Sequence, residues 1–161
     1  MSTELVVCSR CVMDTTALDI QFDTLGICNF CKHYDERIKA DLHLDAQGQA
    51  DLARLVAAVK ASGRNRPYNC LIGVSGGADS TYVAYLVKKV YGLNPLAIHV
   101  DNGWNAELAV ANIKTTLSKL EIDLFTKVLD WNKFRDLQVS FLKSSVGNAE
   151  IPTDHAIVAT L

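Results

Sequence analysis

The sequence predicts an α/β fold in which a parallel sheet carries helices on both faces, preceded by a small module with four cysteines. Two observations lead to this prediction. Short apolar runs alternate with segments of helical periodicity from residue 70 onward, which is typical of parallel strands joined by right-handed crossovers. Two Cys-x-x-Cys pairs stand ahead of that alternation. We therefore expect a zinc-ribbon-like module at 1–34, a connecting helical segment at 35–66 and an α/β domain at 67–161.

Composition limits the classes of protein to consider. With 161 residues, 49% of them hydrophobic, the chain can bury one medium core beside a small module. A net charge of −2 and the lack of a basic stripe argue against nucleic acid as a partner. No apolar run approaches the ~20 residues of a membrane helix, and residues 1–5 do not resemble a secretory signal. We expect a cytoplasmic protein, in which cysteine pairs are more often metal ligands than disulfides.

The first module contains Cys8, Cys11, Cys28 and Cys31, with the two pairs separated by 16 residues. This spacing is typical of a four-cysteine zinc site, and Gly26 suits the tight turn before the second pair. A segment of about 35 residues has little core, so the metal would stabilise it, by on the order of 10–16 kcal/mol in isolated zinc-finger peptides. Disulfides or redox-active pairs are the alternative. His33 is expected at the surface rather than in the metal site.

Polar residues at 34–49 predict a connecting helix or linker. The stripe of Leu52, Leu55, Val56 and Val59 predicts a helix over 50–61, which would end near Gly63.

The centre of the chain is a strand at 70–74, followed by Ser75-Gly76-Gly77-Ala78-Asp79-Ser80 and a helix with Val83, Leu86, Val87 and Val90 on one face. Gly76 and Gly77 have no side chain, so we expect both to adopt positive φ and their N–H groups, at a helix N-terminus, to approach an anion closely. Neither the Walker nor the dinucleotide pattern is present. The alternative is a turn capped by Asp79 or Ser80 that binds nothing. Cys70 is expected to be a small buried residue of the strand.

A second buried strand at 95–100 ends in Asp101-Asn102-Gly103-Trp104-Asn105. Ligands of open α/β sheets bind beyond the carboxyl ends of strands, which places Asp101 for a ribose, the adenine-side loop or a metal. A plain Asp-Asn-Gly turn explains the same residues equally well. His99 is interpreted as a satisfied core histidine, and Trp104 either packs on a nucleotide or closes the core.

The remaining pattern predicts a helix over 106–120, a strand over 124–129 and a helix over 133–145. The helix over 106–120 would bury Ala109, Ile113, Leu117 and Leu120. The helix over 133–145 would bury a stripe with Phe134, Leu137, Phe141 and Leu142. A last helix is expected to open in 150–161, capped by Thr153 or Asp154.

The chain resembles the N-acetyl sugar amidotransferase family, a branch of the PP-loop ATP pyrophosphatases with the adenine nucleotide α-hydrolase-like fold. The SGGxDS pattern of Ser75–Ser80 marks the wider superfamily. The resemblance runs nearly end to end, through Cys8–Thr15, Phe22–Cys31, Val74–Gly77, Val100–Asn105, Asp130–Gln138 and Glu150–Ala156. The zinc module and the last two of these strings narrow it to the family.

The resemblance implies an enzyme that uses ATP and Mg²⁺ to convert the acetamido group of a nucleotide-linked amino sugar into an acetamidino group, for bacterial surface polysaccharides such as lipopolysaccharide. It implies that ammonia comes from a separate glutaminase partner. Residues of the loop suit this task. Ser75 and Ser80 offer hydroxyl groups, Gly76 and Gly77 offer N–H groups, and Asp79 can help hold Mg²⁺. The resemblance makes Asp79 and Ser80 the catalytic candidates.

Two departures from the family bear on these expectations. Ala78 stands where many relatives carry Lys, which removes a positive charge beside the phosphates. The family's domain continues with at least two more strands, so 67–161 is expected to be its first part. One edge of strand 70–74 would then be bare, and we expect it to dimerise, to be covered by 150–161 or to make the chain poorly soluble.

Two other functions remain as alternatives. A tRNA-thiolating PP-loop enzyme would carry a basic surface and further catalytic cysteines, and a non-catalytic zinc and nucleotide module would bind without turnover.

Overall fold

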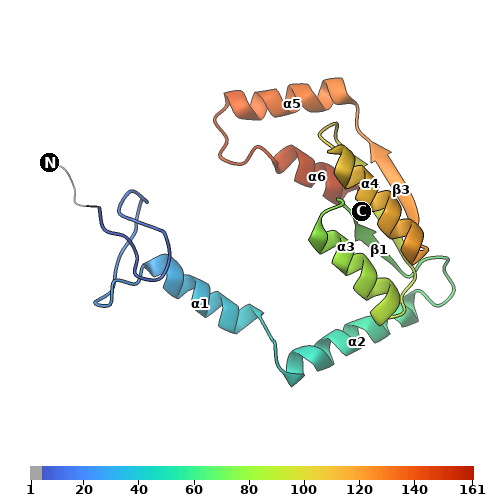
Figure 1. Cartoon of the computed structure of the whole chain (residues 1–161), viewed down its shortest axis with the longest axis horizontal. Helices are drawn as coiled ribbons and strands as arrows, with labels where there is room; N and C mark the ends of the chain where they lie inside the picture. Colours follow the sequence, from blue (N-terminus) through green and yellow to red (C-terminus); the bar gives the residue numbers. More distant parts are fainter. Residues whose placement is uncertain (1–4) are drawn as a thin grey trace. The chain divides into compact units, whose positions relative to one another are not determined.

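The computed structural model describes residues 5–161 (Figure 1). The chain divides into two compact units, Met1–Leu55 and Val56–Leu161, and the boundary falls within helix α2.

The first unit is built around the cysteine pairs. Two isolated antiparallel bridges, Val7 with Asp14 and Phe22 with Cys28, form the short hairpins expected of such a module. Helix α1 (Asn29–Asp41) begins directly after Cys28 and therefore starts inside the segment expected to be the module. Helix α2 (Ala46–Ser62) begins four residues before the predicted start at 50, and none of its residues is buried.

The second unit contains the predicted parallel sheet, with strand order β1-β2-β3. The strands are β1 (Cys70–Gly73), β2 (Pro95–Asp101) and β3 (Asp123–Val128). Ile72 pairs with Ala97, which in turn pairs with Leu124. The α/β class predicted from the alternation is confirmed.

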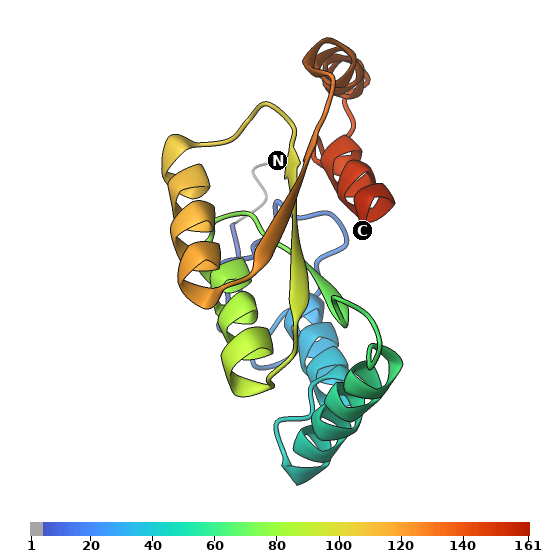
Figure 2. The same cartoon turned by 90° about the vertical axis from the view of Figure 1, so that its right-hand side faces the viewer.

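Helices lie on both sides of this sheet (Figure 2). On one side lie α3 (Ala78–Tyr85), which continues into the π-helix η1 (Leu86–Val90), and α4 (Glu107–Leu120). Helix α6 (Ile151–Thr160) lies on the other side and contacts β2. The core on the first side consists of Ile72, Val74, Ala84, Ala97, Ile113, Leu117, Leu120 and Ile122, with Val87 packed against it.

Helices α3 and α6 also differ from their predicted packing or start. The π-turn changes the phase of the residues that follow Tyr85, so Val90 is exposed although the spacing predicted it on the buried stripe. Val83 precedes the π-turn and is exposed as well. Helix α6 begins at Ile151 after Glu150, so neither Thr153 nor Asp154 is its N-cap.

Helix α5 (Trp131–Lys143) is capped as a helix start should be, because the Asp130 side chain accepts hydrogen bonds from the N–H groups of Asn132 and Lys133. Of its predicted apolar stripe, only Phe134 is buried.

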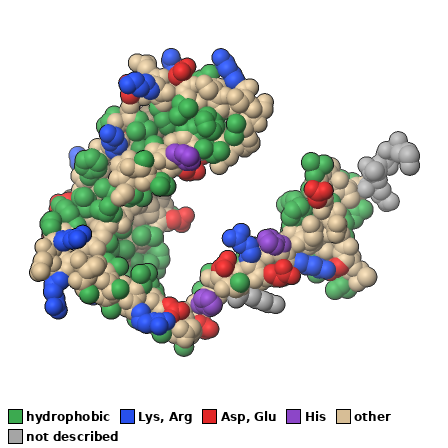
Figure 3. Space-filling model, turned by 180° about the vertical axis from the view of Figure 1, so that it is seen from behind, with side chains coloured by type: hydrophobic (Ala, Val, Ile, Leu, Met, Phe, Trp, Pro, Cys, Tyr) green, Lys and Arg blue, Asp and Glu red, His purple; other side chains and the backbone are tan. Residues whose placement is uncertain are grey.

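Much apolar surface remains exposed in the second unit (Figure 3). Strand β1 is at the end of the strand order, so Leu71 is 47% exposed and Cys70 is half-buried rather than buried as expected. Phe125 of β3 is 49% exposed. Helix α6 packs near β2 and does not extend the sheet beyond β1 in the described chain, so self-association through this edge remains a prediction. Within residues 5–161, no helix has the length and apolar character needed to cross a membrane.

Candidate functional site

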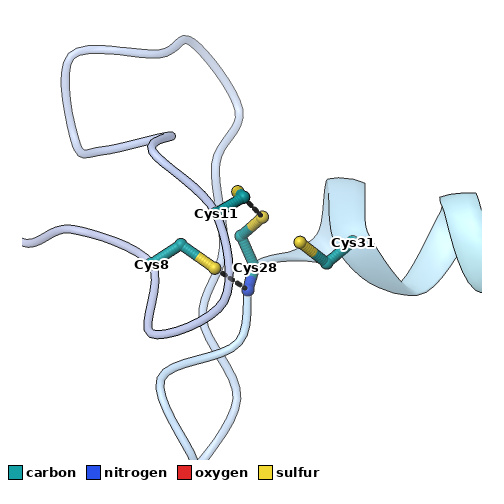
Figure 4. A group of neighbouring side chains, drawn as sticks. All are labelled: Cys8, Cys11, Cys28 and Cys31. Carbon is teal, nitrogen blue, oxygen red and sulfur yellow. Dashed lines mark hydrogen bonds between the residues drawn. The ribbon is translucent and has the colours of Figure 1, made fainter.

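The four cysteines of the first unit converge on one point (Figure 4). Cys8 and Cys11 come from the first turn, Cys28 precedes α1 and Cys31 lies in its first turn. Their sulfur atoms all lie within 4.8 Å of one another, and all are free thiols. His33 is exposed and is not part of the cluster.

The spacing of the sulfurs fits a zinc ion. Four sulfurs at the Zn–S distance of about 2.3 Å on a tetrahedron would be separated by about 3.8 Å. The sulfurs of Cys11 and Cys28 are 3.8 Å apart. A disulfide would need about 2.05 Å. The donor set therefore fits closed structural coordination, with four thiolates and no open position.

The pKa values of two thiols in the cluster, Cys8 and Cys31, are shifted in opposite directions. Burial raises the pKa of Cys8, but hydrogen bonds from the backbone N–H groups of Arg10, Cys28 and Cys11 outweigh it and lower that pKa to about 6. The pKa of Cys31 is raised to about 12, chiefly by the neighbouring Cys11 thiol and then by burial. Since neighbouring thiolates repel one another, complete deprotonation of the cluster requires a cation at its centre.

The loops that carry the cysteines are held by polar contacts. Asp23 Oδ1 accepts the N–H groups of Leu25 and Ile27, each at 2.9 Å, and Lys32 lies 2.9 Å from its other oxygen. Gly26 has a φ of +76°, the left-handed conformation that the predicted turn needs. These contacts place Cys28 opposite Cys8, whose sulfur accepts the Cys28 N–H at 3.3 Å.

In the second unit, Ser75–Ser80 forms a turn between β1 and α3. The two glycines have different conformations. Gly76 has a φ of +79°, and a Cβ built on it would lie 2.2 Å from the carbonyl oxygen of Ala109. Gly77 has a φ of −79° and room for a Cβ, whose nearest atom would be Ser75 Oγ at 3.6 Å. Only Gly76 is thus required by the turn itself, which corrects the expectation that both glycines supply positive φ.

Two N–H groups of this turn are without an acceptor, one on the buried Gly76 and one on the exposed Gly77. Across the described residues, those of Gly76 and Gly77 have no acceptor, and the first N–H groups of α3 have none within the helix. Gly77, Ala78 and Asp79 are exposed. Neither Asp79 nor Ser80 caps α3, because Gly77 occupies the N-cap position and makes no side-chain cap. The arrangement can accept an anion at the positive end of a helix dipole.

Hydroxyl groups close one side of the turn. Ser80 Oγ lies 3.2 Å from both the N–H nitrogen and Oγ of Ser75, and 3.3 Å from the carbonyl oxygen of Gly77. Asp79 lies in the first turn of α3 and has no charged partner among residues 5–161. Its carboxylate is therefore accessible to a metal ion or a ligand.

A cavity of about 330 Å³ opens beside the turn, at the carboxyl ends of β1 and β2. Its walls come from the end of β1, the loop, β2, the segment after β2 and helix α6. The lining residues are Gly73, Val74, Ser75, Ser80, Ile98, His99, Val100, Asn102, Trp104, Asn105, Thr153, Ile157 and Leu161.

Asp101 is not among the lining residues, although its neighbour Asn102 is. Asp101 Oδ1 accepts the N–H of Gly103 at 3.0 Å, the contact expected of a plain Asp-Asn-Gly turn. Asn102 donates to Thr153 Oγ1 at 3.3 Å and so joins the β2 loop to α6. A ligand role for Asp101 stays a prediction, and it would have to use the other carboxylate oxygen.

Trp104 does not close the core, because it is 65% exposed. Its ring packs edge-on against Trp131 with centroids 5.4 Å apart, and its indole N–H donates to Gln138 Oε1 at 2.7 Å. The exposed ring is therefore fixed at the mouth of the cavity by two contacts with α5.

Sequence reasoning missed two residues that contact the loop. His99 was interpreted as a core histidine, but it lines the cavity, and its Nδ1 lies 3.0 Å from the carbonyl oxygen of Val74. Asn112 of α4 donates to the carbonyl oxygen of Gly76 at 3.1 Å. The signal in the sequence was an asparagine in the middle of a helix, where it is a poor helix former.

Comparisons with known proteins give partial matches. No family model matches the chain. An uncharacterised protein of Methanocaldococcus jannaschii is 37% identical over 57 residues, which span 35% of this chain and 21% of that protein. Among solved structures, an NH3-dependent NAD synthetase from Campylobacter jejuni subsp. jejuni, in complex with a nitrate ion, has a TM-score of 0.37 and 19% identity. The match covers 61% of this chain and 41% of that one.

An NMN synthetase from Francisella tularensis has a TM-score of 0.39 and 26% identity, and the match covers 60% of this chain and 38% of that one. The chain thus spans less than half the length of each solved structure, and about a fifth of the curated relative lies within its match.

Proposed function

We propose that this chain is the nucleotide-activating part of an ATP-dependent amidotransferase of the PP-loop type. Its substrate would be a nucleotide-linked N-acetyl sugar, and its product the corresponding acetamidino sugar. The observation that carries the proposal is the Ser75–Ser80 turn, whose glycine N–H groups are without acceptors beside a cavity at the carboxyl ends of the strands. The choice of an amino sugar comes from the resemblance of the chain's motifs to that family.

The proposed reaction has two balanced steps. The amide oxygen of the acetamido group attacks the α-phosphorus of ATP, and the bond to the β-phosphate breaks with release of pyrophosphate. Ammonia then bonds to the activated carbon, AMP leaves with the former amide oxygen, and loss of protons gives the amidine. Gly76 and Gly77 would bind the departing pyrophosphate through their N–H groups. Ser75 and Ser80 would donate to it, and Asp79 would help hold Mg²⁺ against the phosphates.

Ammonia would be supplied by a separate glutaminase. Four of the five cysteines belong to the metal cluster, and the fifth, Cys70, is half-buried with a pKa raised by burial. Burial makes its thiol a poor nucleophile. The cysteine cluster would hold a structural zinc ion, which stabilises the first unit and takes no part in either step.

The test is pyrophosphate release from ATP and Mg²⁺ in the presence of a nucleotide-linked N-acetyl sugar and ammonium. Release that requires the sugar supports the amidotransferase. Release that requires tRNA instead supports a tRNA-modifying enzyme. Binding of ATP without release under either condition supports a binding module and overturns the enzymatic proposal for this chain.

Gly77→Ala is the matched variant for this assay. Its added methyl group meets no protein atom closer than 3.6 Å, so the turn keeps its conformation while the approach to the N–H groups is crowded. We expect the rate of pyrophosphate release to fall at least tenfold, which corresponds to a loss of about 1.4 kcal/mol in transition-state stabilisation. Thr115→Ala on the exposed side of α4 is the control and should release pyrophosphate at the rate of the unchanged chain.

A further inference from the structure

Side chains donate hydrogen bonds to three carbonyl oxygens in and beside the Ser75–Ser80 turn. His99 Nδ1 lies 3.0 Å from the oxygen of Val74, Asn112 Nδ2 lies 3.1 Å from that of Gly76, and Ser80 Oγ lies 3.3 Å from that of Gly77. Because a carbonyl oxygen only accepts, the Nδ1 atom of His99 must carry the proton. Ser80 belongs to the turn itself, whereas His99 lies on β2 and Asn112 on α4, so two other elements of the fold hold the turn from outside.

Because a trans peptide is planar, a hydrogen bond that fixes the carbonyl of one residue also fixes the direction of the next residue's N–H. The carbonyl of one residue and the N–H of the next point in opposite directions. When Asn112 holds the Gly76 oxygen toward α4, the Gly77 N–H is directed away from α4. That N–H is one of the two in the turn that have no acceptor within the described chain.

The contact of His99 acts on the peptide between Val74 and Ser75. The parallel ladder of β1 with β2 ends at Gly73, and the Val74 oxygen goes to the His99 ring instead. This directs the Ser75 N–H the other way, where it meets Ser80 Oγ at 3.2 Å. His99 thereby orients an N–H that is already bonded to the Ser80 hydroxyl. Asn112 orients the Gly77 N–H, which has no acceptor in the described chain.

We propose that Asn112 is a positioning residue that aims the Gly77 N–H at a phosphate group bound by the turn. The inference rests on the proposed function, since it needs an anion at this site, but it concerns a residue outside the SGGxDS pattern. Asn112 acts through the peptide that follows Gly76 and does not itself contact the anion. Without this contact, the peptide between Gly76 and Gly77 can rotate. Part of the free energy of phosphate binding would then be used to orient the Gly77 N–H, and the affinity for phosphate would fall.

The experiment measures the affinity of the full chain for Mg²⁺-pyrophosphate, with adenosine as a second ligand, by titration calorimetry. Asn112→Asp keeps the shape of the side chain but removes the donor and adds a negative charge, whereas Asn112→Ala removes the donor without adding a charge, so the alanine variant decides where the two differ. We expect both variants to bind pyrophosphate about three- to tenfold more weakly, the value of one hydrogen bond. Adenosine affinity should not change. The control, Thr115→Ala, lies on the same helix and should bind both ligands as the unchanged chain does.

A spectroscopic measurement separates aiming from general weakening. In ¹H–¹⁵N spectra, pyrophosphate should shift the Gly77 amide resonance of the unchanged chain strongly and that of Asn112→Asp much less. Equal pyrophosphate affinity in the unchanged chain and both variants would overturn the positioning role while leaving the proposed function intact. Equal losses for adenosine and pyrophosphate would also overturn it, since they indicate a general structural effect. If the unchanged chain itself binds no pyrophosphate, the anion site and this role are both refuted.

Discussion

Alanine at each of the two adjacent glycines of the turn should have opposite effects on stability. At Gly76 a side chain must adopt a φ of +79°, which costs about 1–2 kcal/mol for an L-residue. Its Cβ would also lie 2.2 Å from the Ala109 oxygen, which is backbone and cannot move alone. Overpacking of this kind costs about 1–3 kcal/mol. Gly76→Ala should therefore lower the free energy of unfolding of the second unit by about 2–5 kcal/mol.

Gly77→Ala provides the matched comparison. Its φ of −79° is ordinary for alanine, and the nearest atom to its Cβ would be 3.6 Å away. The loss of unfolded-state entropy should make this variant neutral or more stable by up to about 1 kcal/mol.

Urea denaturation followed by tryptophan fluorescence measures the difference. The chain has two tryptophans, Trp104 and Trp131, and both lie in the second unit, so their signal reports that unit. A Gly76→Ala midpoint equal to that of Gly77→Ala would refute the close packing of this turn against α4.

Two further predictions concern other parts of the chain. With zinc bound, a thiol reagent should modify at most Cys70, and a strong chelator should expose the other four cysteines. Five reactive thiols before chelation would exclude the metal site. The hydrogen bond from Tyr68 to Asp123 raises the pKa of Tyr68 above its usual value near 10. The hydrogen bond therefore stabilises the fold fully below about pH 10, and this stabilisation is lost as the pH rises through the raised pKa. Tyr68→Phe should thus lower the urea midpoint at pH 8 and match the unchanged chain at high pH; an equal deficit at every pH would contradict this reasoning.

The sequence was sufficient for features that depend on local pattern. The α/β alternation, the strand before Ser75, the buried face of α4 and the meeting of the four cysteines all follow from spacing. The apolar stripes of α2 and α5 were also visible, but their burial was not. Burial depends on whether another element covers the stripe, and spacing within one helix does not contain that information.

Contacts between distant segments were beyond the reach of local pattern. Asn112 reaches Gly76 only because α4 packs beside the turn, and His99 meets the Val74 oxygen because the β1–β2 ladder ends one residue earlier. The π-turn at Leu86–Val90 also changes which of the residues after Tyr85 face the core, and the apolar spacing gave no sign of it. The difference between Gly76 and Gly77 arises from the position of Ala109 rather than from either glycine.

The dependence of Gly76 on α4 sets a limit on how the chain can vary in length. Ala109 and Asn112 both lie on α4, and adding or deleting one residue between them would rotate one against the other by about 100°. Only one of the two could then keep its contact with Gly76. Homologous chains with this turn should therefore keep the spacing of these two positions, while the exposed connection at 102–106 can vary in length.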